Sequence, residues 1–174
     1  VVENARDHGI YINHFGGNDG VPKGAPIQAN QGNSCRDGYG IMVSDGTDIT
    51  VESNAIEDTY QAGINLSQHN AAFPMRKVSV TGNTLKNINH GSHVYTGGAI
   101  SVMLGAVNTA NVYYEDVSIS LEKNTIDKSP RNGIYMDRYV ANEMIIRDNQ
   151  FSELGQEEVV KTPQALFIHY VNGQ

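Results

Sequence analysis

Tryptophan is absent from this chain of 174 residues, aromatic residues make up 7% of it, and apolar residues reach only 39%. So low an apolar fraction is unusual for a globular enzyme with a thick core. A solenoid needs less, because only every second residue of each strand faces its narrow interior. The length corresponds to one domain, so residues 1–174 are expected to form a single repetitive β-domain.

Cysteine is nearly absent too, and the single Cys35 excludes an internal disulfide framework. No apolar run approaches the length of a membrane span, so no membrane partner is expected. The net charge of −7 argues against nucleic acid, which requires a basic surface, and disfavours a polyanionic substrate unless local cations offset it. The chain opens on Val1-Val2-Glu3 and shows no capping segment, so we expect a piece of a longer protein.

What the chain does contain is a repeat built on asparagine. Its template is an apolar residue, any residue, an apolar residue, two further residues, asparagine, any residue and an apolar residue. It occurs in Ile49-Val51-Asn54-Ile56, Val78-Val80-Asn83-Leu85, Ile119-Leu121-Asn124-Ile126 and Met144-Ile146-Asn149-Phe151. Short alternating strands that meet at a fixed corner indicate a coil of parallel strands. Because the amide can bond to the corner backbone and to the asparagine of the next turn, we predict an asparagine ladder.

A second kind of strand follows each corner and usually opens with Gly-Ile. Such strands begin at Gly9, Gly40, Gly63, Gly98 and Gly133, and the variant Ala165-Leu166-Phe167-Ile168 closes the series. The spacing from asparagine to glycine is the same between Asn54 and Gly63 as between Asn124 and Gly133. The series predicts about six turns of one all-β coil.

Three motifs carry a resemblance to a known superfamily. They are Val80-Thr81-Gly82-Asn83-Thr84-Leu85, Lys123-Asn124-Thr125-Ile126 and Gly133-Ile134-Tyr135-Met136. The chain resembles the pectin-lyase-like superfamily over nearly all of its length, which implies a right-handed, single-stranded parallel β-helix. Lyases, hydrolases, uronan epimerases, phage tailspikes and adhesins share this fold, so it does not select an activity. The resemblance also implies that the Gly-Ile strands form the floor of a substrate groove.

Alternation within the Gly-Ile strands separates inward from outward side chains. Two outward columns result, with neighbours about 4.8 Å apart. The first reads Tyr11, Met42, Asn65, Ser101, Tyr135, Phe167, and the second reads Asn13, Ser44, Ser67, Met103, Asp137, His169. This mixture of polar and aromatic side chains is typical of a sugar-binding floor. Substrate contacts are therefore expected from Tyr11, Asn13, Asn65, Ser67, Ser101 and Phe167.

Side chains able to transfer protons or carry charge are most concentrated in the last two turns. The expected catalytic residues there are Tyr135, Asp137, Arg138 and His169. Asp137 and His169 are predicted neighbours, and the carboxylate would raise the basicity of the imidazole. Arg138 would neutralise the carboxylate of a uronic acid, while Tyr135 or a histidine removes its C5 proton. The alternative is a surface Asp-Arg pair with a histidine near a frayed end.

Histidines also occur in the loops beside the Gly-Ile strands. His90 and His93 would form one wall of the groove, His93 as a catalytic base and His90 as a substrate contact, with His69 on the opposite wall. An ordinary polar loop is the alternative. No third ligand stands at a metal-like spacing, so neither zinc nor a cofactor is expected. Asp19 and Asp45 suggest calcium, but their spacing fits no known calcium loop.

Two functions remain open. The first is an enzyme, a lyase before a hydrolase or epimerase, that acts on a uronic-acid-containing polysaccharide in the groove over the Gly-Ile strands. The second is a non-catalytic glycan-binding or structural coil, such as the shaft of an adhesin or of a phage tailspike, which would assemble as a homotrimer. The chain has no paired aspartates of the polygalacturonase type, no Asp-Pro-His motif and no clustered calcium aspartates. Either function implies a secreted, cell-surface or virion protein.

Overall fold

The computed structural model describes residues 1–13, 23–35, 37–68, 75–91, 97–104, 118–137, 141–155 and 164–169. Every regular element in these ranges is a β-strand. No helix within them is long and apolar enough to cross a membrane. The predicted all-β class is confirmed.

The strands of the described ranges form three parallel sheets, here named A, B and C, of six, six and five strands. Sheet A holds the strands that follow the asparagine corners, namely β1 (Val2–Glu3), β4 (Gln31–Cys35), β7 (Ala55–Thr59), β10 (Thr84–Ile88), β13 (Thr125–Ser129) and β16 (Gln150–Leu154). Sheet B holds the Gly-Ile strands, namely β2 (Ile10–Asn13), β5 (Ile41–Ser44), β8 (Ile64–Gln68), β11 (Gly98–Leu104), β14 (Asn132–Asp137) and β17 (Leu166–His169). Sheet C precedes the corners and holds β3 (Lys23–Gln28), β6 (Thr47–Glu52), β9 (Arg76–Thr81), β12 (Ser118–Glu122) and β15 (Glu143–Arg147).

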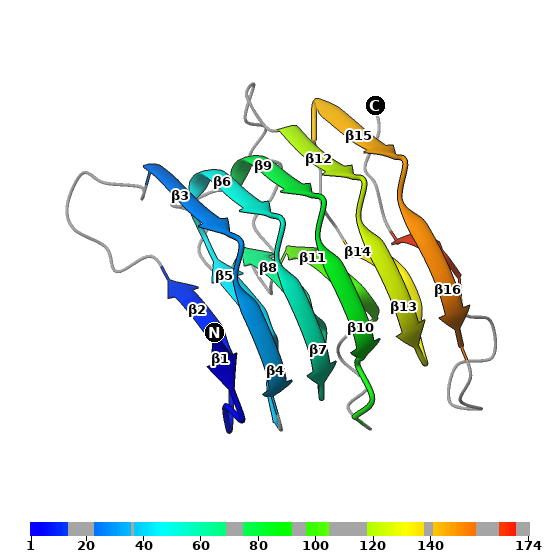
Figure 1. Cartoon of the computed structure of the whole chain (residues 1–174). Coiled ribbons are helices and arrows are strands. Elements are labelled where there is room, and N and C mark those ends of the chain that lie inside the picture. The colour runs from blue at the N-terminus through cyan, green and yellow to red at the C-terminus, as the bar shows by residue number, and fades with distance from the viewer. Residues whose placement is uncertain are drawn as a thin grey trace.

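The chain visits the sheets in the order B, C, A and then returns to sheet B one turn further along the axis. One such turn consists of β5, β6 and β7, and the next of β8, β9 and β10 (Figure 1). The six strands of sheet B confirm the predicted number of turns. The molecule is therefore a parallel β-helix whose three faces are the outward surfaces of the three sheets.

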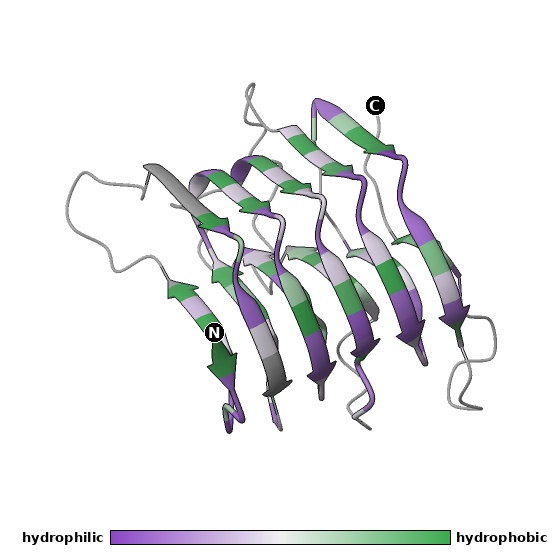
Figure 2. Cartoon of the chain, in the orientation of Figure 1, coloured by the Kyte–Doolittle hydropathy of each residue, from purple (hydrophilic) through white to green (hydrophobic). Residues whose placement is uncertain are grey.

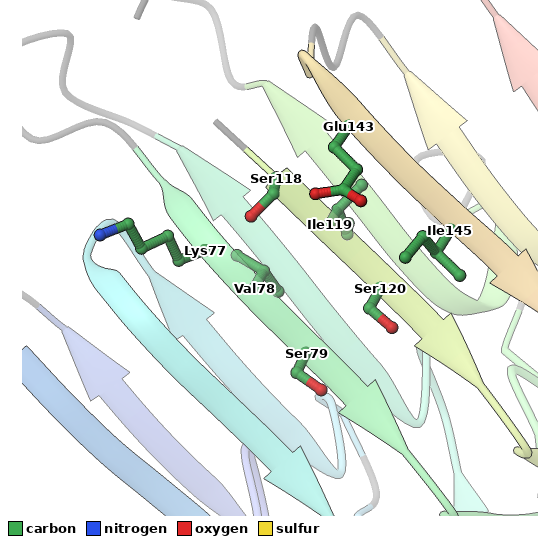
Figure 3. A pocket seen from close by; sticks show the side chains of 8 residues that line it. All are labelled: Lys77, Val78, Ser79, Ser118, Ile119, Ser120, Glu143 and Ile145. Carbon is green, nitrogen blue, oxygen red and sulfur yellow. The ribbon is translucent and has the colours of Figure 1, made fainter. Parts of the chain in front are cut away.

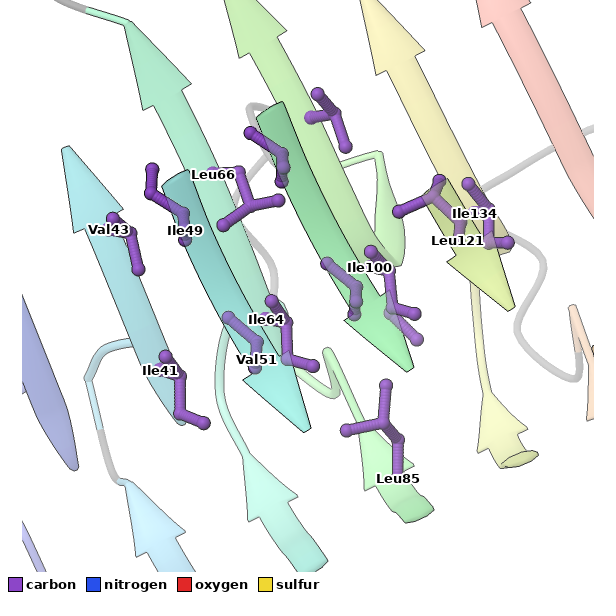
Figure 4. Packing of buried hydrophobic residues seen from close by; sticks show 14 of the residues in the cluster. Ile41, Val43, Ile49, Val51, Ile64, Leu66, Leu85, Ile100, Leu121 and Ile134 are labelled. Carbon is purple, nitrogen blue, oxygen red and sulfur yellow. The ribbon is translucent and has the colours of Figure 1, made fainter. Parts of the chain in front are cut away.

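A narrow apolar core fills the coil. Ile41, Ile64, Ile100 and Ile134 pair in register through sheet B, and each is at most 1% exposed. Leu85, Leu121 and other residues from sheets A and C close the core from the other two sides (Figure 4). Alternating hydrophobic and hydrophilic bands run along most strands (Figure 2), as the period of a strand requires.

The predicted asparagine ladder is present and is one rung longer than expected. Each Nδ2 donates to the Oδ1 of the asparagine one turn on, at 2.9 or 3.0 Å, through Asn30, Asn54, Asn83, Asn124 and Asn149. The same Oδ1 also accepts the backbone N–H of the preceding asparagine at 3.0 Å. Every interior rung therefore satisfies both its own amide and the backbone of the corner.

Asn30 was missed because its flanks depart from the template. Ala25 and Gly32 stand where larger apolar residues stand in the other turns. The corner geometry is nevertheless the same, since Ala29 before Asn30 has a φ of 50° and Lys123 before Asn124 has a φ of 54°. The left-handed residue before each asparagine turns the chain sharply from sheet C into sheet A.

Close approach of the coils explains the glycine that opens a sheet B strand. A Cβ on Gly40 would lie 2.7 Å from the carbonyl oxygen of Gly63 and 2.5 Å from Cγ2 of Ile56. Any side chain there would push neighbouring turns apart. The recurring Gly-Ile signal is thus a packing requirement of the coil rather than evidence of chemistry.

Candidate functional site

The outward face of sheet B carries the two predicted columns in the predicted register. Hydrogen-bonded pairing aligns Tyr11, Met42, Asn65, Ser101, Tyr135 and Phe167 in one row. It aligns Asn13, Ser44, Ser67, Met103, Asp137 and His169 in the other. The structure therefore brings together, strand by strand, residues that are up to 156 positions apart in the sequence, from Tyr11 to Phe167 and from Asn13 to His169.

Three polar side chains in the middle of this face are buried, whereas an open groove floor was expected. Asn65 and Ser67 are each 1% exposed and Ser101 is 0% exposed, while Tyr11 at the N-terminal end is 51% exposed. These three side chains are buried in the structure, and their role as substrate contacts stays a prediction. Alternation tells which face a side chain takes, but it carries no information about what covers that face. In the same two rows, Tyr11 is exposed, and the half-buried residues are Met42, Met103, Tyr135, Asp137 and Phe167.

Two buried oxygens on this closed face have no hydrogen-bond partner. They are Oγ of Ser44 and Oδ1 of Asn65. Nδ2 of Asn65 donates to Oγ of Ser67 at a long distance of 3.5 Å, whereas Oδ1 of the same amide has no partner. Buried polar groups without partners are uncommon and costly, because they lose water without a replacement.

We expect Ser44→Ala to raise the free energy of unfolding by about 1 kcal/mol, because it removes an unpaired buried hydroxyl. Ser101→Ala is the matched control on the same face, since Oγ of Ser101 is equally buried but donates to the carbonyl of Gly98 at 3.2 Å. That control should lose about 1 kcal/mol. Urea unfolding of both variants measures the difference, and a loss of stability in Ser44→Ala would contradict the prediction.

The fifth and sixth strands of sheet B hold a stacked aromatic pair. The rings of Tyr135 and Phe167 are parallel within 3°, with centroids 5.3 Å apart. A Cβ on Gly97 would lie 2.3 Å from Cδ2 of Tyr135, and one on Gly98 would lie 2.9 Å from its Cβ. The two glycines thus leave the room that the tyrosine ring occupies. Tyr135 and Phe167 are half-buried, so the pair remains partly accessible.

Next to this pair, Asp137 and His169 occupy paired positions on β14 and β17. Asp137 is half-buried. For His169 and Asn13 the described structure gives the backbone position alone. Arg138 lies outside the described residues, as do His69, His93 and Asp19. The predicted catalytic group is therefore located by register at Tyr135, Asp137 and His169.

His90 lies elsewhere. It follows β10, two residues beyond the end of that strand, and its ring meets that of Tyr60 edge-on at 6.0 Å. Its backbone N–H donates to the carbonyl of Thr59 at 3.3 Å, which ties it to the end of sheet A. No described contact joins His90 to the outward face of sheet B, so its substrate role remains a prediction.

The calcium suggestion gains no support from the described residues. Asp45 is buried, with its backbone in the left-handed region at a φ of 59°. Its N–H donates to the carbonyl of Ser67 at 2.9 Å, which places it in the turn after β5. No group of three or more histidine, cysteine, aspartate or glutamate side chains gathers in the described ranges.

A second aromatic cluster lies at the N-terminal end of sheet B. The ring of His8 lies 5.3 Å from that of Tyr11 and 5.2 Å from that of Tyr39. Nδ1 of His8 accepts the backbone N–H of Tyr39 at 3.2 Å and lies 3.3 Å from Oδ1 of Asp7. Burial, assisted by the negative charge of Asp7, raises the pKa of the Tyr39 phenol. The tyrosine is therefore a neutral hydrogen-bonding group at physiological pH.

A groove that the sequence did not suggest lies on the outward face of sheet C (Figure 3). It has a volume of about 260 Å³ and is lined by Lys77, Val78, Ser79, Ser118, Ile119, Ser120, Glu143 and Ile145. Ser79, Ser120 and Ile145 pair in one row across β9, β12 and β15. The sequence signal for this groove is the serine at the same outward position of consecutive turns, Ser79 and Ser120, which belongs to no recognisable motif.

Charged side chains border this groove toward the asparagine corner. Arg147 lies 2.5 Å from Glu122, whose carboxylate also accepts a short hydrogen bond from the hydroxyl of Ser120. The bond from Ser120 and then that from Arg147 lower the pKa of Glu122, so the carboxylate stays charged well into the acidic range. This border is an ion pair at the surface of sheet C.

Residues 1–107 match the model of the family described as right handed beta helix region. The match covers more than half of the chain, and the protein belongs to this family. Membership confirms the right-handed coil, agrees with the pectin-lyase-like superfamily and points to a polysaccharide-related or structural role. No curated protein and no solved structure matches the chain significantly.

Proposed function

We propose that this β-helix binds and processes a polysaccharide on the outward face of sheet B, at the coils that carry Tyr135, Asp137 and Phe167. The observation that supports this most is the stacked aromatic pair with a half-buried carboxylate in the adjacent row. Aromatic carbon and a nearby ionisable group are the two components that a sugar-processing site needs. The buried side chains Asn65, Ser67 and Ser101 have no part in the proposal.

In this proposal Asp137 and His169 act together. A carboxylate beside an imidazole stabilises the protonated ring and raises its basicity, which suits proton removal from a carbon next to a carboxylate. Tyr135 would position the sugar ring or relay the proton, and Arg138 would offset the substrate charge. The chemistry proposed first is β-elimination on a uronic acid, ahead of hydrolysis or epimerisation. The C5 proton is removed, the C4–O bond breaks as a double bond forms between C4 and C5, and a second acid, for which the Tyr135 hydroxyl is the candidate, protonates the departing oxygen. Such a protein would act outside the cell, at a cell surface or on a virion.

A non-catalytic structural or glycan-binding shaft is the second candidate. The burial of Asn65, Ser67 and Ser101 favours it, because a closed face suits a coil that separates other parts of an assembly. A tailspike shaft of this kind would form a homotrimer. The two candidates differ in one respect, since only the first turns over a substrate.

Asp137→Asn tests the first candidate directly. If Asp137 takes part in proton transfer, product formation should fall by about a hundredfold or more, because general acid–base groups contribute that much. The midpoint of thermal unfolding should stay nearly unchanged, since the side chain is outward and half-buried. Asp127→Asn on the outward face of sheet A is the matched control, where the carboxylate accepts from Oγ of Ser152 at 2.7 Å.

Turnover is measured as new reducing ends and as ultraviolet absorbance of unsaturated uronate. Full activity in Asp137→Asn, or equal losses in Asp137→Asn and Asp127→Asn, would contradict the proposed role of Asp137. Tyr135→Phe separates the functions of the tyrosine. The stacking ring is kept and the hydroxyl is lost, so turnover should fall while glycan affinity is retained.

A further inference from the structure

We infer that the groove on the outward face of sheet C is a second carbohydrate site, which takes a ring of a neutral glycan. It lies on a different sheet from the proposed catalytic face, and its lining residues come from β9, β12 and β15. The inference therefore stands or falls independently of turnover on sheet B.

Three of the residues that line the groove are serines, namely Ser79, Ser118 and Ser120, and they lie beside the apolar side chains Val78, Ile119 and Ile145. Oγ of Ser79 is 3.1 Å from Oγ1 of Thr81, and the hydroxyl of Ser120 donates to Glu122, so both are held in place. Once its proton is committed to Glu122, the oxygen of Ser120 can still accept from a ligand. Serines have the smallest polar side chains, so Ser79 and Ser120 leave space beside the longer side chains of Lys77 and Glu143.

Two groups that line the groove are available for new hydrogen bonds. Ser118 and Glu143 are paired residues on β12 and β15, and Figure 3 shows the hydroxyl and the carboxylate next to one another. Within the described part of the chain neither side chain makes a hydrogen bond or ion pair. Glu143 is exposed and acceptor-only when ionised, so it suits a ligand that donates hydroxyl protons.

The charges around the groove favour a neutral ligand. Lys77 is the cationic residue among those that line the groove. Its Nζ is 4.0 Å from Oδ1 of Asp48, so the carboxylate partly neutralises its charge. Glu143 adds one unpaired negative charge, and the chain as a whole carries −7. An anionic sugar would meet this carboxylate unfavourably, whereas a neutral sugar offers donors to it without repulsion.

Size and apolar surface fit the same ligand class. A volume of about 260 Å³ is just below the usual range of small-molecule pockets, which limits the occupant to a small unit such as one sugar ring. Ile145 ends the serine row and offers an apolar surface against the C–H groups of such a ring.

The test uses short neutral oligosaccharides of glucose, mannose, galactose or xylose, with binding measured by calorimetry and by saturation-transfer NMR. At least one should bind the wild-type chain. Glu143→Gln should weaken that binding about tenfold, because a charge-assisted hydrogen bond becomes a neutral one. Ser118→Leu, which fills the groove, should abolish it, and Thr125→Leu on the outward face of sheet A is the control that should not.

Asp137→Asn should leave this binding unchanged, which separates the site from the proposed activity on sheet B. The inference is overturned if no neutral oligosaccharide binds, or if both Glu143→Gln and Ser118→Leu bind as well as the wild type. It is also overturned if the affinity falls in Asp137→Asn alone, a result that would instead support a single binding face on sheet B. Circular dichroism of each variant verifies that the coil remains folded.

Discussion

Replacing Asn83 by alanine should lower the free energy of unfolding by about 3 kcal/mol. Asn83 is an interior rung of the ladder, 1% exposed, and its Oδ1 accepts both the backbone N–H and Nδ2 of Asn54. Its Nδ2 donates to the carbonyl of Val51 and to Oδ1 of Asn124, each at 2.9 Å. Alanine leaves several of these groups buried without a partner, and each such group costs about 1–3 kcal/mol.

The comparison with Asn83→Asp sharpens this prediction. A carboxylate keeps the acceptor for Asn54 but cannot donate to Val51 or Asn124 when it is ionised. Asn83→Asp should therefore also be destabilised, and more at neutral pH than in acid, where the protonated form recovers a donor. Thr84→Ala at the next, exposed position should change stability by less than about 0.5 kcal/mol. A loss below 1 kcal/mol in Asn83→Ala would contradict the structural role of the ladder.

Ile100→Ala should cost about 2–5 kcal/mol, the range for truncating a large buried aliphatic side chain. Ile100 is 0% exposed and pairs in register with Ile64 on one side and Ile134 on the other. Its removal interrupts the inward stack midway along the coil, where neighbouring turns cannot move in to fill the cavity without breaking strand pairing. Chemical denaturation measures this loss. If the m-value, the slope of the unfolding free energy against denaturant concentration, stays unchanged, the whole effect is a change in stability.

Lys86→Ala serves as the control for this truncation. Lys86 points outward from sheet A, with Nζ 3.4 Å from Oε1 of Glu57 and a side chain that is 59% exposed. Exposed ion pairs of this kind contribute little, so a change within about 0.5 kcal/mol is expected. If Ile100→Ala behaved like Lys86→Ala, the assignment of the inward column would be wrong.

The fold could be predicted because its signals repeat. Inward residues such as Ile64 and Ile134 recur at matched positions, and a fixed asparagine follows the preceding strand, so register follows from counting. The rung at Asn30 was missed because Ala25 and Gly32 blur the template, although the corner backbone is the same. The corner backbone can therefore form even where the flanking residues differ from the apolar template.

The candidate site could be predicted only in part. The row that joins Ser101, Tyr135 and Phe167 follows from strand alternation and is observed as predicted. The closure over Asn65 was not predictable, since burial of an outward side chain depends on tertiary cover rather than on period. The groove at Ser118 escaped notice because no single residue in it carries a recognisable motif.

The most direct test of the proposed function is incubation of the intact chain with a panel of acidic and neutral polysaccharides, with both reducing ends and unsaturated uronate followed over time. The proposal predicts that both signals rise on at least one uronic-acid-containing polymer and that Asp137→Asn removes them. The proposal is contradicted if circular dichroism shows an intact coil and yet no polymer gives a product or exchanges its C5 proton. The structural or glycan-binding shaft would then be the remaining candidate.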